Sequence, residues 1–336
     1  MQGTWVPMQA TLLLTRTDVR TLLDMDACIV AVEEAFRARA EGATLQGGVL
    51  GTQAPDGVFH VKVAGLARGR SYYAAKINAN YPGNPARHGL PAIQGVISLH
   101  DVCDGALLAL LDSMEITTLR TAAATAVAAR YLSRASSGIV TIIGCGTQGR
   151  GQLRALARVR AIHTVFAHDI EPATARAYAT EMSRELECDV HAVTDYRTAV
   201  RRSDIVVTCT PARAPFLAAR DVPAGVFLAA VGADSESKQE LEPAVLALGT
   251  VVVDVLEQCA AIGELHHALA AGVMRRDAVH AELAEVVSGL RSGRSSDAEV
   301  TIFDSTGTAL EDVAAASIVY ERALMQGRGQ EVRLGV

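Results

Sequence analysis

The chain has 336 residues, half of them hydrophobic, and a formal net charge of −6. This length suits two domains of ordinary size, and the negative charge argues against a general binder of nucleic-acid phosphates. The apolar runs are far shorter than the roughly 20 residues of a membrane span, and six scattered cysteines follow no zinc or disulfide spacing, so we expect no membrane contact and no metal.

The N-terminal third predicts a domain that mixes helices and strands. The opening residues lack the basic region of a secretory signal, so we expect a cytoplasmic protein. Apolar side chains recur at helical spacing over 17–41, which predicts an amphipathic helix. Strand patterns bounded by Gly and Pro follow at 57–64, 71–78, 93–100 and 107–112. This order predicts an α+β domain built on a mainly antiparallel sheet.

From about residue 137 the pattern changes to strands that alternate with helices. The strand segments read SGIVTIIG, HTVFAHD, DIVVTCT, GVFLAAVG, GTVVVDV and VTIFD. Such alternation predicts an α/β fold with a parallel, doubly wound sheet. An alanine-rich helix is expected at 308–325, and we expect it to return to the first domain. The predicted domains are therefore 1–122 with 305–336, for substrate binding and dimerisation, and 123–304, for nucleotide binding.

A glycine motif follows the first strand of the second domain. Gly144, Gly146 and Gly149 form a GxGxxG pattern between a strand and a helix, which is the context of a Rossmann dinucleotide site. The first glycine permits the tight turn, the second lets the backbone approach the pyrophosphate, and the third allows close helix packing. Asp169 ends the next strand, where a carboxylate binds the adenosine ribose and repels a 2′-phosphate. These residues predict NAD as the cofactor.

Several motifs in register carry a family resemblance over nearly the whole chain. These are the segment around Lys76, the TxxRTAAxxAxAA run that contains Arg120, the GCGTQ loop, the GADSxxKQEL stretch and the terminal FDSTGxAxED. In them the chain resembles the ornithine cyclodeaminase and μ-crystallin family, and VLEQ at 255–258 is most similar to its alanine dehydrogenases. The resemblance implies an NAD(H)-dependent oxidoreductase that acts on the CH–NH bond of a small L-amino or imino acid, as a homodimer.

Three side chains are the expected catalytic residues. Arg120 can bind a substrate carboxylate through bidentate hydrogen bonds. A desolvated Lys76 beside it would bind the carboxylate or move a proton at the α-nitrogen. Asp234, at the carboxyl end of a strand, would steady an iminium or act as a base. Each also has a structural interpretation: Lys76 as a surface lysine, Arg120 in a helix-face ion pair, and Asp234 as a loop cap.

The remaining expected contacts divide between substrate and cofactor. Lys62 and His60 are predicted to line the substrate site. The predicted cofactor contacts, besides Gly144, Gly146 and Asp169, are Thr117, Thr121, Thr147, Gln148, Thr210, Val231, Gly232 and Ser305.

One departure from the family bears on the reaction. Cyclodeaminases carry an additional arginine ahead of the strand at 57–64 and a glutamate on it, whereas this chain has no arginine between Arg39 and Arg68 and places His60 nearest the glutamate. This favours dehydrogenation or imine reduction, of the alanine dehydrogenase or ketimine reductase type. The alternatives are a cyclodeaminase that releases ammonia from ornithine, lysine or arginine, and a μ-crystallin-like binding protein without turnover.

Overall fold

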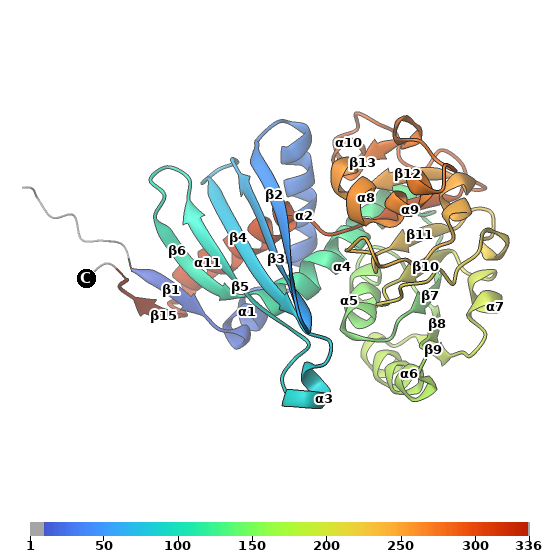
Figure 1. Cartoon of the computed structure of the whole chain (residues 1–336), viewed down its shortest axis with the longest axis horizontal. Helices are drawn as coiled ribbons and strands as arrows, with labels where there is room; N and C mark the ends of the chain where they lie inside the picture. Colours follow the sequence, from blue (N-terminus) through green and yellow to red (C-terminus); the bar gives the residue numbers. More distant parts are fainter. Residues whose placement is uncertain (1–9, 335–336) are drawn as a thin grey trace, which may run out of the picture. The chain divides into compact units, whose positions relative to one another are not determined.

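The computed structural model describes residues 10–334 and divides into two compact units (Figure 1). Unit 1 runs up to Arg120 and resumes at Ala309, and unit 2 spans Thr121–Thr308. Over the range 10–334, no helix combines the length and apolar character that crossing a bilayer requires.

Unit 1 is built on a seven-stranded sheet in the order β15-β1-β6-β5-β4-β3-β2. Its strands are β1 (Thr11–Leu14), β2 (Thr44–Ala54), β3 (Gly57–Leu66), β4 (Tyr72–Asn80), β5 (Ile93–Asp101), β6 (Leu107–Asp112) and β15 (Gln330–Val332). Neighbouring strands are antiparallel except for the parallel pair β1 and β6. The mainly antiparallel sheet is as predicted, while β1 and β15 were not anticipated.

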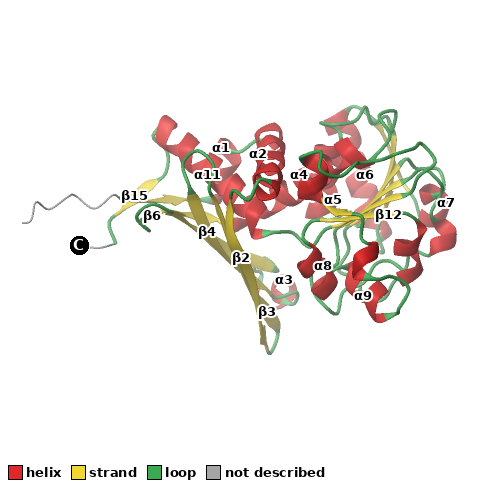
Figure 2. Cartoon of the chain, turned by 90° about the horizontal axis from the view of Figure 1, so that it is seen from above, coloured by secondary structure: helices red, strands yellow, loops and turns green. Residues whose placement is uncertain are grey.

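Helices pack on one face of this sheet (Figure 2). The helices of unit 1 are α1 (Arg16–Leu22), α2 (Met25–Ala40), α3 (Asn84–His88), the first part of α4 (Ser113–Leu132), and α11 (Ala309–Gln326). The single helix predicted over 17–41 is wrong, because the chain is extended at Leu23 and Asp24 caps a second helix by accepting from the Ala27 N–H. Helix α11 contacts the sheet of unit 1, as predicted from its apolar face.

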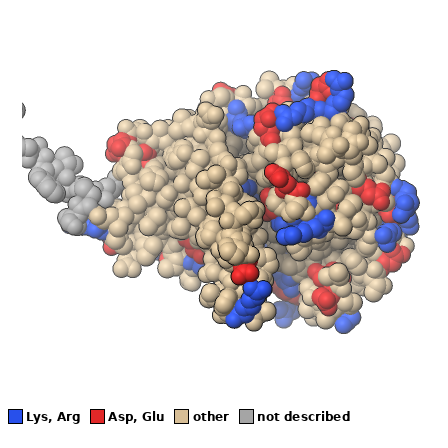
Figure 3. Space-filling model, viewed as in Figure 1, with Lys and Arg blue, Asp and Glu red and all other residues tan. Residues whose placement is uncertain are grey.

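Alternation along the strands sends two kinds of side chain to the two sheet faces. On β4, Lys76 lies on the face that packs against α11, and the next residue, Ile77, lies on the opposite face and is 46% exposed. Leu50, Phe59 and Val96 share that opposite face and are also exposed. Figure 3, in which this face is turned to the viewer, shows few charged side chains over it.

Unit 2 is a parallel, doubly wound sheet in the order β13-β12-β14-β11-β10-β7-β8-β9, which confirms the predicted Rossmann fold. Its strands are β7 (Ile139–Ile143), β8 (Thr164–His168), β9 (Asp189–Ala192), β10 (Ile205–Thr208), β11 (Phe227–Ala230), β12 (Thr250–Val253), β13 (Ala281–Glu282) and β14 (Thr301–Asp304). The central strands are buried along their whole length, as both covered faces require.

Helices flank both faces of the unit 2 sheet (Figure 2). They are the remainder of α4, then α5 (Thr147–Leu156), α6 (Pro172–Leu186), α7 (Tyr196–Val200), α8 (Leu256–Ile262), α9 (Glu264–Ala270) and α10 (Leu283–Val287), with 3-10 turns η1 (Ala219–Asp221), η2 (Pro243–Leu248) and η3 (Arg276–Ala278). The sheet order reverses beside β7, which lies between β8 and β10. In open α/β sheets, ligands bind at the carboxyl ends of the strands at such a point.

Candidate functional site

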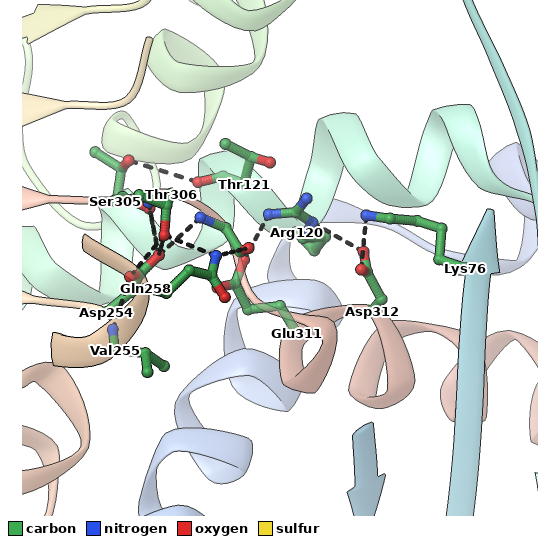
Figure 4. Close-up of polar contacts among 12 residues, drawn as sticks. Lys76, Arg120, Thr121, Asp254, Val255, Gln258, Ser305, Thr306, Glu311 and Asp312 are labelled. Carbon is green, nitrogen blue, oxygen red and sulfur yellow. Dashed lines mark hydrogen bonds and ion pairs between the residues drawn. The ribbon is translucent and has the colours of Figure 1, made fainter. Parts of the chain in front are cut away.

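Unit 1 holds a buried cluster of charges centred on Asp312. Figure 4 shows this carboxylate, on α11, between Lys76 of β4 and Arg120 of α4. One carboxylate oxygen lies 2.6 Å from Lys76 Nζ, and the other accepts a hydrogen bond of 2.9 Å from Arg120 Nε. All three side chains are nearly inaccessible to solvent, so the interpretation of Lys76 as a surface lysine is wrong.

Burial and neighbouring charges shift the pKa of both Lys76 and Asp312. Desolvation and the positive charges of Arg120 and Lys62 outweigh Asp312 and lower the pKa of Lys76 to about 7. Burial would raise the pKa of Asp312, but its contacts with Lys76 and Arg120 hold it below the ordinary value. The cluster therefore contains a fixed carboxylate and a lysine that can gain or lose a proton near neutral pH.

Further side chains surround this cluster. Lys62 is buried on β3 directly opposite Lys76, and His60 lies half-buried on the same strand opposite Asn78. Buried Glu311 accepts a hydrogen bond of 2.9 Å from Arg120 Nη1. Three basic side chains thus lie around two carboxylates, so the cluster carries one positive charge in excess when Lys76 is protonated. Such an imbalance suits an anionic ligand.

Two nitrogens of the Arg120 guanidinium are already bound to acidic side chains of unit 1. Its Nε donates to Asp312 and its Nη1 to Glu311, so the side chain does form an ion pair, with acids that the sequence interpretation did not single out. These two contacts raise the pKa of Arg120 against the opposing effect of burial. Nη2 is the remaining nitrogen of the guanidinium. A substrate carboxylate would therefore meet a partly engaged Arg120.

In unit 2 the glycine loop has the geometry that a pyrophosphate needs. Gly144 has a φ of 106°, a conformation that favours glycine, and a Cβ on Gly149 would lie 2.1 Å from the Gly144 carbonyl oxygen. At Gly146, the N-cap of α5, a Cβ would meet no described heavy atom within 4 Å. The open space lies beside the start of α5, where a helix N-terminus favours an anion. The loop therefore fits a dinucleotide.

Asp169 lies at the carboxyl end of β8 and fixes this loop. Its Oδ2 accepts a hydrogen bond of 2.9 Å from the Cys145 N–H, and its Oδ1 accepts one of 3.0 Å from the Glu171 N–H. Both contacts fix the orientation of the carboxylate, the group that binds ribose hydroxyls in such sites. The geometry fits the expected role of Asp169 toward NAD.

The other expected cofactor residues lie on the same edge of the unit 2 sheet or on α4. Thr147 and Gln148 open α5, Thr210 follows β10, and Val231 and Gly232 follow β11. Ser305 follows β14, while Thr117 and Thr121 lie one turn apart on α4. Because carboxyl ends of parallel strands meet at one edge, the loops after β7, β10, β11 and β14 lie side by side.

Asp234 lies on the loop after β11 and pairs with Lys238. Its Oδ1 is 2.6 Å from Lys238 Nζ, and its side chain is 49% exposed. The carboxylate is thus held by a surface ion pair, which contributes little to stability and leaves an acid at the solvent-facing end of this edge.

Buried carboxylates along this edge were not anticipated from the sequence. Asp254, directly after β12, accepts hydrogen bonds of 2.8 and 2.7 Å from the Thr306 and Gly307 N–H groups, as Figure 4 shows for Thr306. The Ser305 hydroxyl donates to the same carboxylate oxygen at 3.4 Å. Asp254 therefore fixes the loop after β14. Across residues 10–334, no group of three or more His, Cys, Asp or Glu side chains is arranged to hold a metal ion.

Comparison with known protein families yields one match over most of the chain. The model of the ornithine cyclodeaminase/mu-crystallin family matches residues 9–327. The alanine dehydrogenase of Archaeoglobus fulgidus is 39% identical over 324 residues, which cover 96% of this chain and 98% of that protein.

Two solved structures share both domains of the chain. An archaeal alanine dehydrogenase dimer with bound NAD has a TM-score of 0.93 at 39% identity and covers 97% of this chain and 100% of its own. The Δ1-pyrroline-2-carboxylate reductase of Thermococcus litoralis, in complex with NADH and L-proline, has a TM-score of 0.91 at 34% identity. That match covers 96% of this chain and 100% of the reductase.

Proposed function

Because the chain belongs to the ornithine cyclodeaminase/mu-crystallin family, we propose that it is an NAD(H)-dependent oxidoreductase acting on the CH–NH bond of a small L-amino or imino acid. The observation that carries this proposal is the buried Lys76–Asp312–Arg120 cluster. A buried lysine whose pKa lies at about 7 because of desolvation is typical of a site that transfers protons.

The cofactor is NAD(H), which the glycine loop and Asp169 would hold. When bound, it accepts a hydride from the α-carbon of the amino acid or returns one to the imine carbon. The oxidation converts an L-amino acid and NAD⁺ into the imino acid, NADH and a proton. The protein must therefore bind a carboxylate and manage one proton at the substrate nitrogen.

Residues of unit 1 supply these two needs. We assign the substrate carboxylate to Arg120 and Lys62, the two buried cationic side chains beside Lys76. Lys76 receives the proton from the substrate nitrogen during oxidation and returns it during reduction, because its pKa of about 7 makes both directions accessible at neutral pH. His60, half-buried on β3, would contact the substrate side chain.

Asp234 is assigned a role in the hydrolysis of the imino acid that the oxidation forms. Hydrolysis of an imino acid requires a base that takes a proton from water, and the half-exposed carboxylate of Asp234 is suited to accept this proton. The proposal for Asp234 rests on its location at the carboxyl edge of the sheet and on this chemistry.

A substrate panel tests the proposed function. We expect NADH to be oxidised when the protein is mixed with ammonia and pyruvate or glyoxylate, or with a cyclic imino acid. Ammonium release from ornithine, lysine or arginine with no net change in nicotinamide absorbance would instead identify a cyclodeaminase. Tight binding of an imino acid with no turnover of either kind would identify a binding protein.

Replacing Asp169 by asparagine is expected to reduce the preference for NADH over NADPH by about 10–100-fold, because one charged hydrogen-bond partner of the ribose is worth that much. The negative charge that repels a 2′-phosphate is lost in this variant, while an oxygen remains to accept from the Cys145 N–H. The ratio of the two kcat/KM values measures the effect. Asp189→Asn, at an exposed acid of β9, is the matched control and should leave the ratio unchanged.

We also propose that the protein is a homodimer formed through the exposed sheet face of unit 1. A cluster of exposed apolar side chains, here Leu50, Phe59, Ile77 and Val96, is typical of a protein–protein interface. The similar archaeal alanine dehydrogenase was solved as a dimer.

Ile77→Asp is expected to convert the dimer to a monomer, since a desolvated charge at the centre of an apolar interface has no partner. Light scattering after size-exclusion chromatography reports the mass. The control is Leu290→Asp, which places the same charge on an exposed apolar side chain of unit 2. A monomeric wild-type protein, or an Ile77→Asp dimer, would refute this interface.

A further inference from the structure

Glu240 connects two loops at the carboxyl edge of the unit 2 sheet. Its Oε1 accepts hydrogen bonds of 2.7 Å from both the N–H and the hydroxyl of Thr210, which follows β10. Its Oε2 accepts a hydrogen bond of 2.9 Å from the N–H of Gly232, which follows β11. The side chain is completely buried. One carboxylate therefore fixes the distance between the two loops.

The packing around Gly232 shows how closely this carboxylate is fitted. A Cβ at position 232 would lie 2.4 Å from the carboxylate of Glu240 and 2.5 Å from the Thr210 carbonyl oxygen. Any larger residue at position 232 would therefore displace the carboxylate, and neither loop can move away without losing a hydrogen bond. The bridge therefore holds the loops in one arrangement.

Two more buried acids hold Glu240 itself in place. Glu264 accepts hydrogen bonds of 2.6 and 3.2 Å from the N–H groups of Glu240 and Leu241. Asp304, the last residue of β14, in turn accepts hydrogen bonds of 3.2 and 2.9 Å from the N–H groups of Glu264 and Leu265. Each carboxylate thus fixes the main chain that carries the next one, from β14 to the loops after β10 and β11.

The topology assigns this bridge to one half of the dinucleotide. The sheet order reverses beside β7, and Asp169 follows β8, so the adenosine half belongs to the β7 and β8 side. The loops after β10 and β11 lie on the other side of the reversal, where the nicotinamide half binds. The hydrogen bonds of the Glu240 carboxylate to Thr210 and Gly232 lie on this side.

We propose that Glu240 is a positioning residue for the nicotinamide half of the cofactor, acting through Thr210 and Gly232. This role rests on the proposed NAD(H)-dependent function. It requires a carboxylate of this length, since both oxygens accept hydrogen bonds. In Glu240→Gln one of the oxygens becomes an NH₂ group that faces an N–H donor, so one loop is released. In Glu240→Asp the shorter side chain cannot reach both loops.

The test compares a probe of the whole dinucleotide with a probe of its adenosine half. Calorimetric titration of Glu240→Gln with NADH should give a Kd raised by about tenfold or more, while the Kd for ADP stays within about twofold of wild type. Asp169→Ala is the matched control and should weaken the binding of both probes. A variant that was merely loosened throughout unit 2 would also lose both probes equally.

Three results with the variants would overturn the proposal. They are an unchanged NADH affinity in Glu240→Gln, an equal loss of NADH and ADP, and a Glu240→Asp variant that binds NADH like wild type. If Glu240→Gln does not fold, the NADH affinity of Glu240→Asp alone tests the proposal. A wild-type protein that bound ADP but not NADH would refute this role, and one that bound neither would refute the proposed function as well.

Discussion

Replacing Lys76 by methionine is expected to lower kcat by about 10²–10⁴-fold, the usual contribution of a positioned acid or base, in both directions of the reaction. Methionine has a similar volume and suits a buried site, so the change removes the amine without opening a cavity. Asp312 keeps its contact with Arg120 in this variant. The Kd for NADH, whose expected contacts include the glycine loop and Asp169, should stay within about twofold of wild type.

The pH dependence of the reaction tests the same residue. During oxidation Lys76 must be neutral to receive a proton, so kcat/KM is expected to rise as the pH rises through about 7. During reduction it must be protonated, so kcat/KM should fall over the same interval. Lys76→Arg retains the charge but does not titrate in this range, and its profile should lose the transition near pH 7.

A matched variant separates these effects from a general loss of positive charge. Arg68→Met removes an exposed cation of unit 1 that pairs with Glu34 at the surface. Its kcat and pH profile should match those of the wild type. A Lys76→Met enzyme with wild-type kcat would show that the lysine neither gives nor takes the proton.

Asp312→Asn is expected to lower the free energy of unfolding by about 3–5 kcal/mol, because it leaves buried cations without their shared carboxylate. Lys76 and Arg120 each lie within 3 Å of this acid, and Lys62 is buried opposite Lys76. Urea denaturation followed by circular dichroism gives the free energy, and NADH oxidation measured in parallel should fall with the lost positioning of both cations.

The loss of unfolding free energy in Asp312→Asn depends on pH through the protonation of Lys76. Without Asp312 the pKa of Lys76 falls below its value of about 7, so the amine of the variant is already neutral where the wild type is still charged. The difference in unfolding free energy should therefore be larger at pH 6 than at pH 8. Glu311→Gln, which disturbs the Arg120 contact but leaves Asp312 beside Lys76, is the control and should show a smaller loss with no such pH trend.

The Rossmann unit was predictable because each of its signals is local. The strand patterns, the glycine loop and Asp169 all follow one another over a short stretch of sequence, and the structure places Gly144, Gly146 and Gly149 in the conformations that their spacing implies. A pattern of this kind depends on backbone geometry and strand order alone. It needs no knowledge of which distant residues meet.

Unit 1 was less predictable because its signals are weak or interrupted. The strand β2 contains three glycines, and most of its residues are exposed, so it lacks the alternation that marks a half-buried strand. The break between α1 and α2 depends on a single capping aspartate, Asp24, inside a continuous helical pattern. A local capping bond prevailed there over periodicity.

The carboxylates of the site depend on contacts between distant parts of the chain. Glu311 and Asp312 stand in an alanine-rich helix, where two adjacent acids that prove buried are a signal of ion pairing, but their partners Lys76 and Arg120 lie about 190 or more residues earlier. Glu240 was visible only as part of a motif. Its role follows from hydrogen bonds to two loops that the sequence alone does not bring together.

The interrupted course of unit 1 has a consequence for synthesis on the ribosome. In the sequence, unit 2 stands wholly between the two segments of unit 1. Its last residue is therefore synthesised before α11. Until that last helix emerges, the face of the unit 1 sheet that α11 covers is incompletely packed, and Lys76 and Arg120 lack Asp312. The nucleotide-binding unit can therefore fold first, which reverses the usual N-terminal-first order, and the nascent N-terminal sheet is the segment that a chaperone would need to protect.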